Sequence, residues 1–134
     1  LVFPLHPRTR ARAEEFGLTE RLESIPNIVL TGPAGYLDFV ALMADSKLVL
    51  TDSGGLQEET TALGIPCLTL RENTERPITV TEGTNTIVGN STDVILEAAN
   101  DILDNGGKAG RIPDLWDGHT AERIAEIIEQ TIGG

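Results

Sequence analysis

The sequence is poor in residue types that would define some classes of protein. Its 134 residues include one cysteine, one methionine and 4% aromatic residues. One cysteine excludes a disulfide framework within the chain, and the two distant histidines give no spacing typical of a metal site. Because Cys67 lies in the apolar run IPCLTL, we expect a buried, unreactive thiol in a reducing compartment. We also expect no metal and a cytoplasmic location.

Basic residues and long apolar runs are also scarce. Ten Lys and Arg residues stand against 21 Asp and Glu residues, which gives a formal net charge of −11. Nucleic acids and anionic membranes both select basic surfaces, so we expect neither as a partner. No apolar stretch approaches the ~20 residues that a membrane-spanning helix needs. A polyanionic ligand would therefore have to be held by local groups.

Aliphatic residues, by contrast, are plentiful. Hydrophobic residues make up 40% of the chain and charged residues 23%, which is typical of a globular protein with an aliphatic core. The length suits one domain over residues 1–134. The chain opens with a strand pattern at Leu1 and its one methionine, Met43, lies deep in a helical pattern. We interpret it as a piece of a longer protein.

Short apolar runs alternate with helical patterns along the chain. Strands are predicted at residues 1–5, 27–30, 48–50, 66–70 and 86–88. Helices are predicted over residues 19–24, 35–44, 57–64 and 92–105. Three more are predicted: one that ends near residue 17, a short one that ends at residue 83 and a last one that starts at residue 120. This alternation predicts an α/β fold with a doubly wound parallel sheet, Rossmann-like, covered on both faces. The apolar stripes of 35–44 and of the last helix are expected to face the core.

The stretch Leu48–Gly64, LVLTDSGGLQEETTALG, carries the strongest signal for a site. Its apolar start predicts a fully buried strand, Gly54 and Gly55 predict a tight turn, and Gln57 is expected to open a helix that ends at Gly64. A glycine turn leaves no side chain between its N–H groups and a ligand. Because a helix N-terminus favours phosphate, this pattern indicates nucleotide binding.

The same stretch has a plainer interpretation. A Ser-Gly-Gly turn is a common connection, and this one matches neither a P-loop nor a GxGxxG fingerprint. Glu58 and Glu59, in the first turn of the predicted helix, could serve only to complement its dipole. Asp52 is expected to fix the turn through backbone hydrogen bonds. The residues alone leave both interpretations open.

Further polar residues follow the other predicted strands. Ligands of such sheets bind outside the carboxyl ends of the strands, and that edge carries the segments 6–8, 32–33, 52–55 and 71–76. Arginine suits a diphosphate because its planar fork donates two parallel hydrogen bonds. Arg71 and Arg76 are thus candidate ligands, or else form a surface ion pair with Glu75. His6 contacts an anion, acts as an acid or base, or caps a turn.

Five segments of the chain form a distinctive set. They are VFPLHPRTR at 2–10, LTDSGGLQEE at 50–59, GIPCLTLRENTERP at 64–77, EGTNTIVG at 82–89 and DGHTAERI at 117–124. Together they resemble the non-hydrolysing UDP-N-acetylglucosamine 2-epimerases. The likeness covers nearly the whole chain. The resemblance implies two Rossmann-like domains arranged as in B-type glycosyltransferases, with a UDP-sugar in the cleft, and this chain resembles most of the C-terminal domain.

The resemblance implies roles for residues around the glycine turn. Ser53 and the backbone of Gly54 and Gly55 would hold the diphosphate. Glu59 would accept hydrogen bonds from the ribose hydroxyls. Phe39 matches a segment that borders the uracil.

Two further motifs carry implied roles. His6 and Arg8 belong to a segment near a UDP-sugar effector site between the domains. Arg71 and Arg76 belong to the LRxxTERP signature beside the nucleotide. Ile78 stands where the more usual signature continues with glutamate, so the resemblance leaves the exact sugar open.

The implied reaction is reversible inversion at carbon 2 of the sugar, through anti elimination of UDP to an acetamido glycal and re-addition. Its catalytic groups lie in the N-terminal domain and upstream of Leu1, so none is expected here, and no NAD, metal or PLP is implied. The implied partners are the UDP-sugar substrate, the missing N-terminal domain and a second copy in a homodimer. The product would enter surface polysaccharide.

Other readings stay open. They are a UDP-diacetamido-sugar 2-epimerase, a hydrolysing homologue, a UDP-sugar glycosyltransferase domain and a non-catalytic UDP-binding module.

Overall fold

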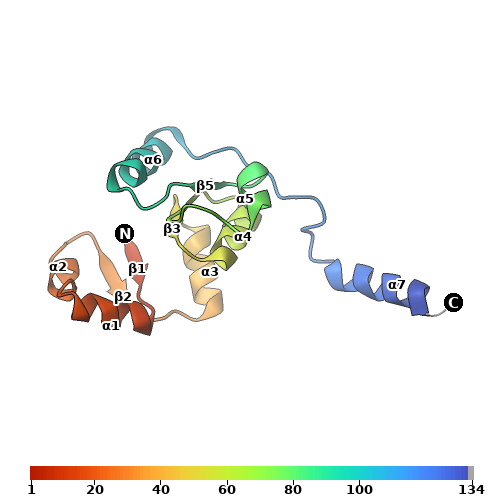
Figure 1. The fold of residues 1–134 in the computed structure, drawn as a ribbon, viewed down its shortest axis with the longest axis horizontal. Coiled ribbons are helices and arrows are strands. Elements are labelled where there is room, and N and C mark those ends of the chain that lie inside the picture. Colours follow the sequence, from red (N-terminus) through yellow and green to blue (C-terminus); the bar gives the residue numbers. More distant parts are fainter. Residues whose placement is uncertain (133–134) are drawn as a thin grey trace. The chain divides into compact units, whose positions relative to one another are not determined.

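The computed structural model describes residues 1–132 as short strands and helices in alternation (Figure 1). The chain divides into two compact units, one of residues 1–41 and one from Leu42 onward, and each is described here by itself. Every strand pairing in both units is parallel. The predicted α/β fold with parallel pairing is therefore confirmed.

The first unit holds two strands and two helices. They are β1 (Val2–Pro4), α1 (Pro7–Glu15), α2 (Thr19–Glu23) and β2 (Val29–Thr31). β1 and β2 pair in parallel, with Phe3 opposite Leu30. Helix α1 begins at Pro7, because His6 caps it and the fixed φ of Pro7 suits a first helical turn.

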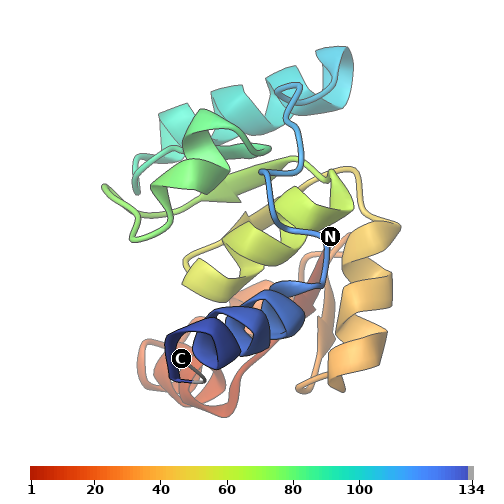
Figure 2. The ribbon, with the colours of Figure 1, turned by 90° about the vertical axis from the view of Figure 1, so that its right-hand side faces the viewer.

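Helix α3 (Tyr36–Ala44) leads from the first unit into the second. The second unit then contains β3 (Val49–Thr51), α4 (Gly54–Leu63), β4 (Cys67–Thr69), α5 (Pro77–Thr81), β5 (Asn85–Ile87), α6 (Thr92–Asn105) and α7 (Thr120–Ile132). The sheet order is β3-β4-β5, with β4 in the centre. Helices α4 and α6 both pack against β4, and Figure 2 shows the strand between them.

The interior of the second unit is unusually polar. The central strand buries Cys67, Leu68 and Thr69 completely or nearly so. Around it, the buried polar side chains outnumber the buried apolar ones; they are Thr51, Gln57, Thr60, Thr61, Thr69, Thr79, Thr84 and Asn85. This core therefore depends on hydrogen bonds as well as on apolar contact.

Several apolar side chains are less buried than we predicted. Leu50 is 36% exposed although β3 was expected to be fully buried, because neighbouring strand side chains point to opposite faces and only Thr51 is enclosed. The stripe of α3 buries Met43 but leaves Tyr36 68% exposed, and Ile124 and Ile128 of α7 are about half exposed. None of the helices within residues 1–132 is both long enough and apolar enough to cross a membrane.

The buried cysteine gives a first test of this core. Cys67 has no exposed surface, and burial raises the pKa of its thiol even though Thr60 and Thr69 lie within hydrogen-bonding reach. The thiolate is the reactive form, so the folded chain should react with a disulfide reagent at neutral pH at least about a hundredfold more slowly than the urea-unfolded chain. Measuring the release of the coloured thiol from the reagent over time gives this rate.

A matched control moves the thiol to the surface. In a Cys67→Ser, Ala109→Cys double variant, the new thiol stands at an exposed position and should react equally fast folded or unfolded. Rapid modification of folded wild-type chain would show that β4 is not buried as described.

Candidate functional site

Helix α4 begins three residues earlier than we predicted, at Gly54. Ser53 is the N-cap, with extended backbone angles (φ −85°, ψ 130°), and its side chain makes no capping hydrogen bond. The N–H of Ser53 donates to Oγ1 of Thr51 at 3.0 Å. Thr51, and not Asp52 as predicted, therefore fixes the turn, since a threonine hydroxyl can reach the N–H two residues on.

Gly54 and Gly55 form the first turn of α4 and do not make a separate turn before it. Neither has a positive φ. A Cβ on Gly54 would lie 3.7 Å from Oε2 of Glu75, and one on Gly55 would lie 4.0 Å from Oγ of Ser53, which are ordinary contact distances. Glycine is up to about 1 kcal/mol less favourable than alanine in a helix. Neither backbone geometry nor packing requires these glycines, and what they leave open is access to the helix N–H groups.

Glu58 and Glu59 lie in the second turn of α4. The first turn contains no acidic residue, so the interpretation that these glutamates only complement the helix dipole is wrong. Glu58 instead forms an ion pair with Arg76, in which its Oε1 lies 3.0 Å from Nε of the arginine. Glu59 lines a shallow depression of about 290 Å³ together with Glu58, Ala62 and Trp116. Trp116 was not among the predicted site residues.

Both candidate arginines lie beside the start of α4, and each is paired with a glutamate. Nη2 of Arg71 lies 3.2 Å from Oε1 of Glu75, whose other oxygen is the nearest atom to the open side of Gly54. Arg76 pairs with Glu58. All four side chains are at least one-third exposed, so each pair contributes little to stability. The structure thus brings Gly54, Arg71 and Arg76 together around two carboxylates.

The remaining predicted residues belong to the first unit. Nδ1 of His6 accepts a hydrogen bond from the N–H of Arg8 at 3.2 Å, which is the turn-capping role that we weighed for this histidine. Phe39 is half-buried on α3. The proposed roles of His6, Arg8 and Phe39 in binding a ligand stay predictions.

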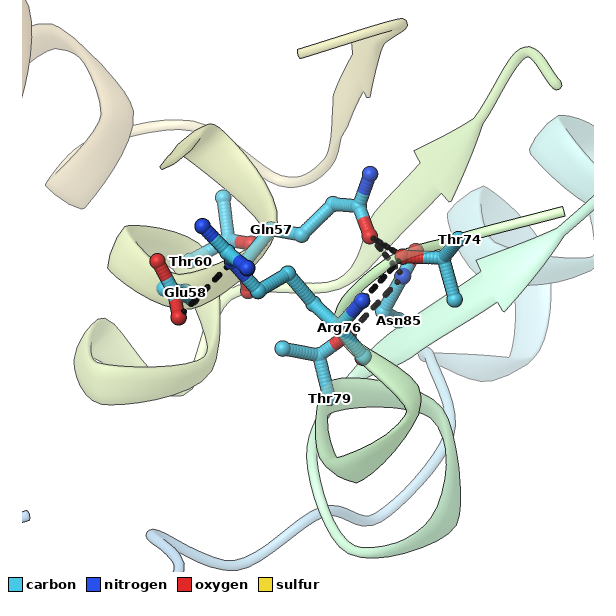
Figure 3. Close-up of polar contacts among 7 residues, drawn as sticks. All are labelled: Gln57, Glu58, Thr60, Thr74, Arg76, Thr79 and Asn85. Atoms are coloured by element: carbon cyan, nitrogen blue, oxygen red, sulfur yellow. Dashed lines mark hydrogen bonds and ion pairs between the residues drawn. The ribbon is translucent and has the colours of Figure 1, made fainter. Parts of the chain in front are cut away.

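Sequence reasoning missed a buried polar network beneath the start of α4 (Figure 3). Oε1 of Gln57 accepts from Oγ1 of Thr74 at 2.5 Å and from Nδ2 of Asn85 at 3.1 Å. Gln57 and Asn85 have no exposed surface. The only signal in the sequence was a polar residue within each buried element. That signal does not reveal partners 17 and 28 residues apart.

The glycines of α4 predict a contrast in stability. Gly54→Val should leave the unfolding temperature unchanged or raise it slightly, because a Cβ has room there and glycine is a poor helix former. Gly64 caps the other end of α4 at φ 72°, so Gly64→Ala should destabilise the chain by about 1–2 kcal/mol. Thermal unfolding followed by circular dichroism measures both, and a large loss for Gly54→Val would mean that the fold itself needs this glycine.

A parallel sheet with a glycine-led helix at the carboxyl end of a strand defines the second unit as a Rossmann-like α/β fold. Comparison with known proteins narrows this class. The chain belongs to the UDP-N-acetylglucosamine 2-epimerase family, whose profile matches residues 1–129.

Curated relatives agree with this assignment. The UDP-N-acetylglucosamine 2-epimerase of Methanocaldococcus jannaschii is 42% identical over 128 residues, covering 96% of this chain and 34% of the relative. The UDP-2,3-diacetamido-2,3-dideoxy-D-glucuronate 2-epimerase of Pseudomonas aeruginosa is 41% identical over 133 residues, covering 96% and 34%. The chain therefore spans about a third of the length of these relatives.

Solved structures match in the same way. The M. jannaschii UDP-GlcNAc 2-epimerase in complex with UDP-GlcNAc and UDP gives a TM-score of 0.82 at 40% identity, over 96% of this chain and 35% of that one. The Staphylococcus aureus MnaA structure with UDP gives 0.80 at 32% identity, over 99% and 36%.

Proposed function

We propose that this chain is the UDP-binding half of a UDP-N-acetylglucosamine 2-epimerase. One observation carries the proposal: Gly54 and Gly55 open α4 although neither φ nor packing calls for glycine. Their N–H groups, and the hydroxyl of Ser53, which makes no capping hydrogen bond, suit the oxygens of a diphosphate. A solved relative of the chain, with a TM-score of 0.82, is a complex with UDP-GlcNAc and UDP.

The other predicted residues fit around this diphosphate. Glu59 lies one turn further along α4, where it lines the 290 Å³ depression, and would accept hydrogen bonds from the ribose hydroxyls. Arg71 and Arg76 would exchange a glutamate partner for phosphate oxygens. Phe39 would border the uracil, by the same family resemblance.

The proposed reaction makes UDP a leaving group. When the bond between carbon 1 and the phosphate oxygen breaks, negative charge develops on that oxygen. A helix N-terminus and an arginine aimed at this charge stabilise the transition state more than the ground state. In this proposal the chain supplies that stabilisation, while residues outside it remove and return the proton at carbon 2.

The proposed full protein is larger than this chain. Its relatives are about three times as long, so residues 1–134 would form the C-terminal UDP-sugar-binding domain and would bind without turning over. We propose a second copy as the further partner, in a cytoplasmic homodimer. His6 and Arg8 would face the effector site between the N-terminal and C-terminal domains.

A second candidate function is epimerisation of a UDP-diacetamido uronate. The Pseudomonas relative carries that name at 41% identity, against 42% for the Methanocaldococcus relative, so identity does not choose between the sugars. The complete protein, supplied separately with each UDP-sugar, would show the substrate by which one it converts.

Nucleotide binding by the chain alone tests the proposal directly. Isothermal titration should show UDP bound more tightly than UMP, which lacks the second phosphate, and more tightly than ADP, which lacks uracil. Gly54→Val should abolish UDP binding, because its side chain would cover the phosphate-facing N–H groups.

Gly64→Ala is the matched control for this experiment. It changes a glycine of the same helix at the end away from the proposed phosphate, so it should bind UDP normally even though it is less stable. Equal UDP affinity for wild type and Gly54→Val would place the phosphate elsewhere.

The ribose contact gives a separate prediction. Glu59→Ala should weaken UDP by roughly 10- to 100-fold, because hydrogen bonds to a charged group contribute about 1.5–3 kcal/mol. It should change the affinity for 2′,3′-dideoxy-UDP little, since that ligand lacks the hydroxyl donors. Glu97→Ala, an exposed glutamate of α6, serves as the control. The same loss for both ligands would remove Glu59 from the ribose.

A further inference from the structure

We infer that two buried amide side chains, Gln57 and Asn85, position Arg76 for the nucleotide, an inference that rests on the proposed UDP site. Gln57 belongs to α4 and Asn85 to β5, and both are fully buried. Nδ2 of Asn85 donates to Oε1 of Gln57 at 3.1 Å, and Oδ1 of Asn85 accepts from Thr69 of β4 at 2.7 Å. The amide pair thus joins the phosphate-facing helix to the sheet.

Two hydroxyls connect this pair to the backbone of Arg76, as Figure 3 shows. Oγ1 of Thr74 donates to Gln57 at 2.5 Å and accepts from the N–H of Arg76 at 2.9 Å. Oγ1 of Thr79 accepts from Asn85 at 3.1 Å and donates to the carbonyl of Arg76 at 2.7 Å. Both polar backbone groups of Arg76 are therefore held by hydroxyls that end on the amide pair.

Arg76 needs this support because of where it stands. It is the N-cap of α5, with φ −122° and ψ 59°, outside the regular helix and strand regions. Its side chain is 44% exposed and reaches α4 at Glu58, the residue after Gln57. A long exposed side chain samples many rotamers, and a backbone that also moves widens the region that its guanidinium can reach. By holding the backbone of Arg76, the network limits the guanidinium to the neighbourhood of the start of α4.

Gln57 and Asn85 are positioning residues in this scheme and do not themselves touch the nucleotide. Nε2 of Gln57 has no hydrogen-bond partner among the described residues, so the role of this side chain in the fold is exerted through its oxygen. A group held in place before binding loses less freedom when the ligand arrives. The expected consequence is that the network changes affinity for the diphosphate without contacting it.

The test removes one hydroxyl at constant size. Thr74→Val breaks the bonds to Gln57 and to the Arg76 N–H together, and should weaken UDP about tenfold while changing the affinity for uridine little. Thr84→Val is the matched control, because this buried threonine donates to the carbonyl of Ile65 at 2.7 Å, outside the network. It should lower thermal stability to a similar degree and leave UDP affinity unchanged.

A double-mutant cycle separates positioning from general damage. In an Arg76→Ala background, Thr74→Val should have no further effect on UDP affinity, because the group that it positions is gone. An equal tenfold loss with or without Arg76 would overturn the inference, and so would an equal loss for Thr74→Val and Thr84→Val.

Amide hydrogen exchange tests whether Thr74 holds the backbone of Arg76, without any nucleotide. The Arg76 N–H should exchange at least about tenfold faster in Thr74→Val than in wild type or Thr84→Val, because its acceptor is lost. If wild type does not bind UDP, the proposed function fails, while this exchange rate still decides whether the network holds Arg76. An unchanged rate would overturn the positioning role.

Discussion

The structure of the second unit depends on one constraint: a buried polar group without a hydrogen-bond partner is costly, so most such groups among its described residues are paired, with Nε2 of Gln57 and Oγ1 of Thr61 as exceptions. An unpaired amide or hydroxyl in an apolar interior costs roughly 1–3 kcal/mol in mutational data. Gln57, Asn85, Thr69 and Thr79 are all fully buried, and their bonds connect α4, β4, β5 and α5. Because each of these bonds joins two different elements, the network restricts how α4, β4, β5 and α5 can be arranged relative to one another.

Buried and exposed polar groups have different roles in this unit. The residues that hold the framework have no accessible surface, whereas Ser53, Gly55 and Arg76, which are proposed to meet the ligand, are exposed. Ligand-binding groups must reach solvent, and an exposed group is mobile unless something beneath it is rigid. The polar core supplies that rigidity directly under the start of α4. A purely aliphatic core could bury as much surface without fixing the loop that carries Arg76.

The sequence predicts most of this fold because its signals are local. Apolar runs located all the strands to within a few residues, and Gly64 ended α4 where its left-handed conformation requires glycine. The start of α4 was placed too late because two glycines usually indicate a turn, whereas neither glycine has a positive φ here and both lie inside the helix directly after Ser53. Burial was harder to predict. A helical stripe shows which side chains share a face, but not what covers them, so the exposure of Tyr36 was not foreseen.

The candidate site was predictable where it consisted of one continuous stretch and not where it joined distant ones. The two glycines of α4 are visible in the sequence as an adjacent pair, but no local sequence pattern pairs Gln57 with Thr74 or Asn85. A polar residue in a buried position signals that a partner exists and says nothing of where the partner lies. Long-range hydrogen bonds of this kind need the fold before they can be recognised.

The charges around α4 suggest how so acidic a chain could hold a diphosphate. Arg71 and Arg76 are each matched by a glutamate, and the Glu75 carboxylate lies beside Gly54, where the proposed phosphate would bind. Under the proposed function, binding is then an exchange in which phosphate replaces a carboxylate of similar charge on the same donors. The exchange leaves the net charge of −11 unchanged, so binding depends on local contacts: those of the phosphate with the arginines and the helix N–H groups must exceed the exposed glutamate pairs, each of which contributes little.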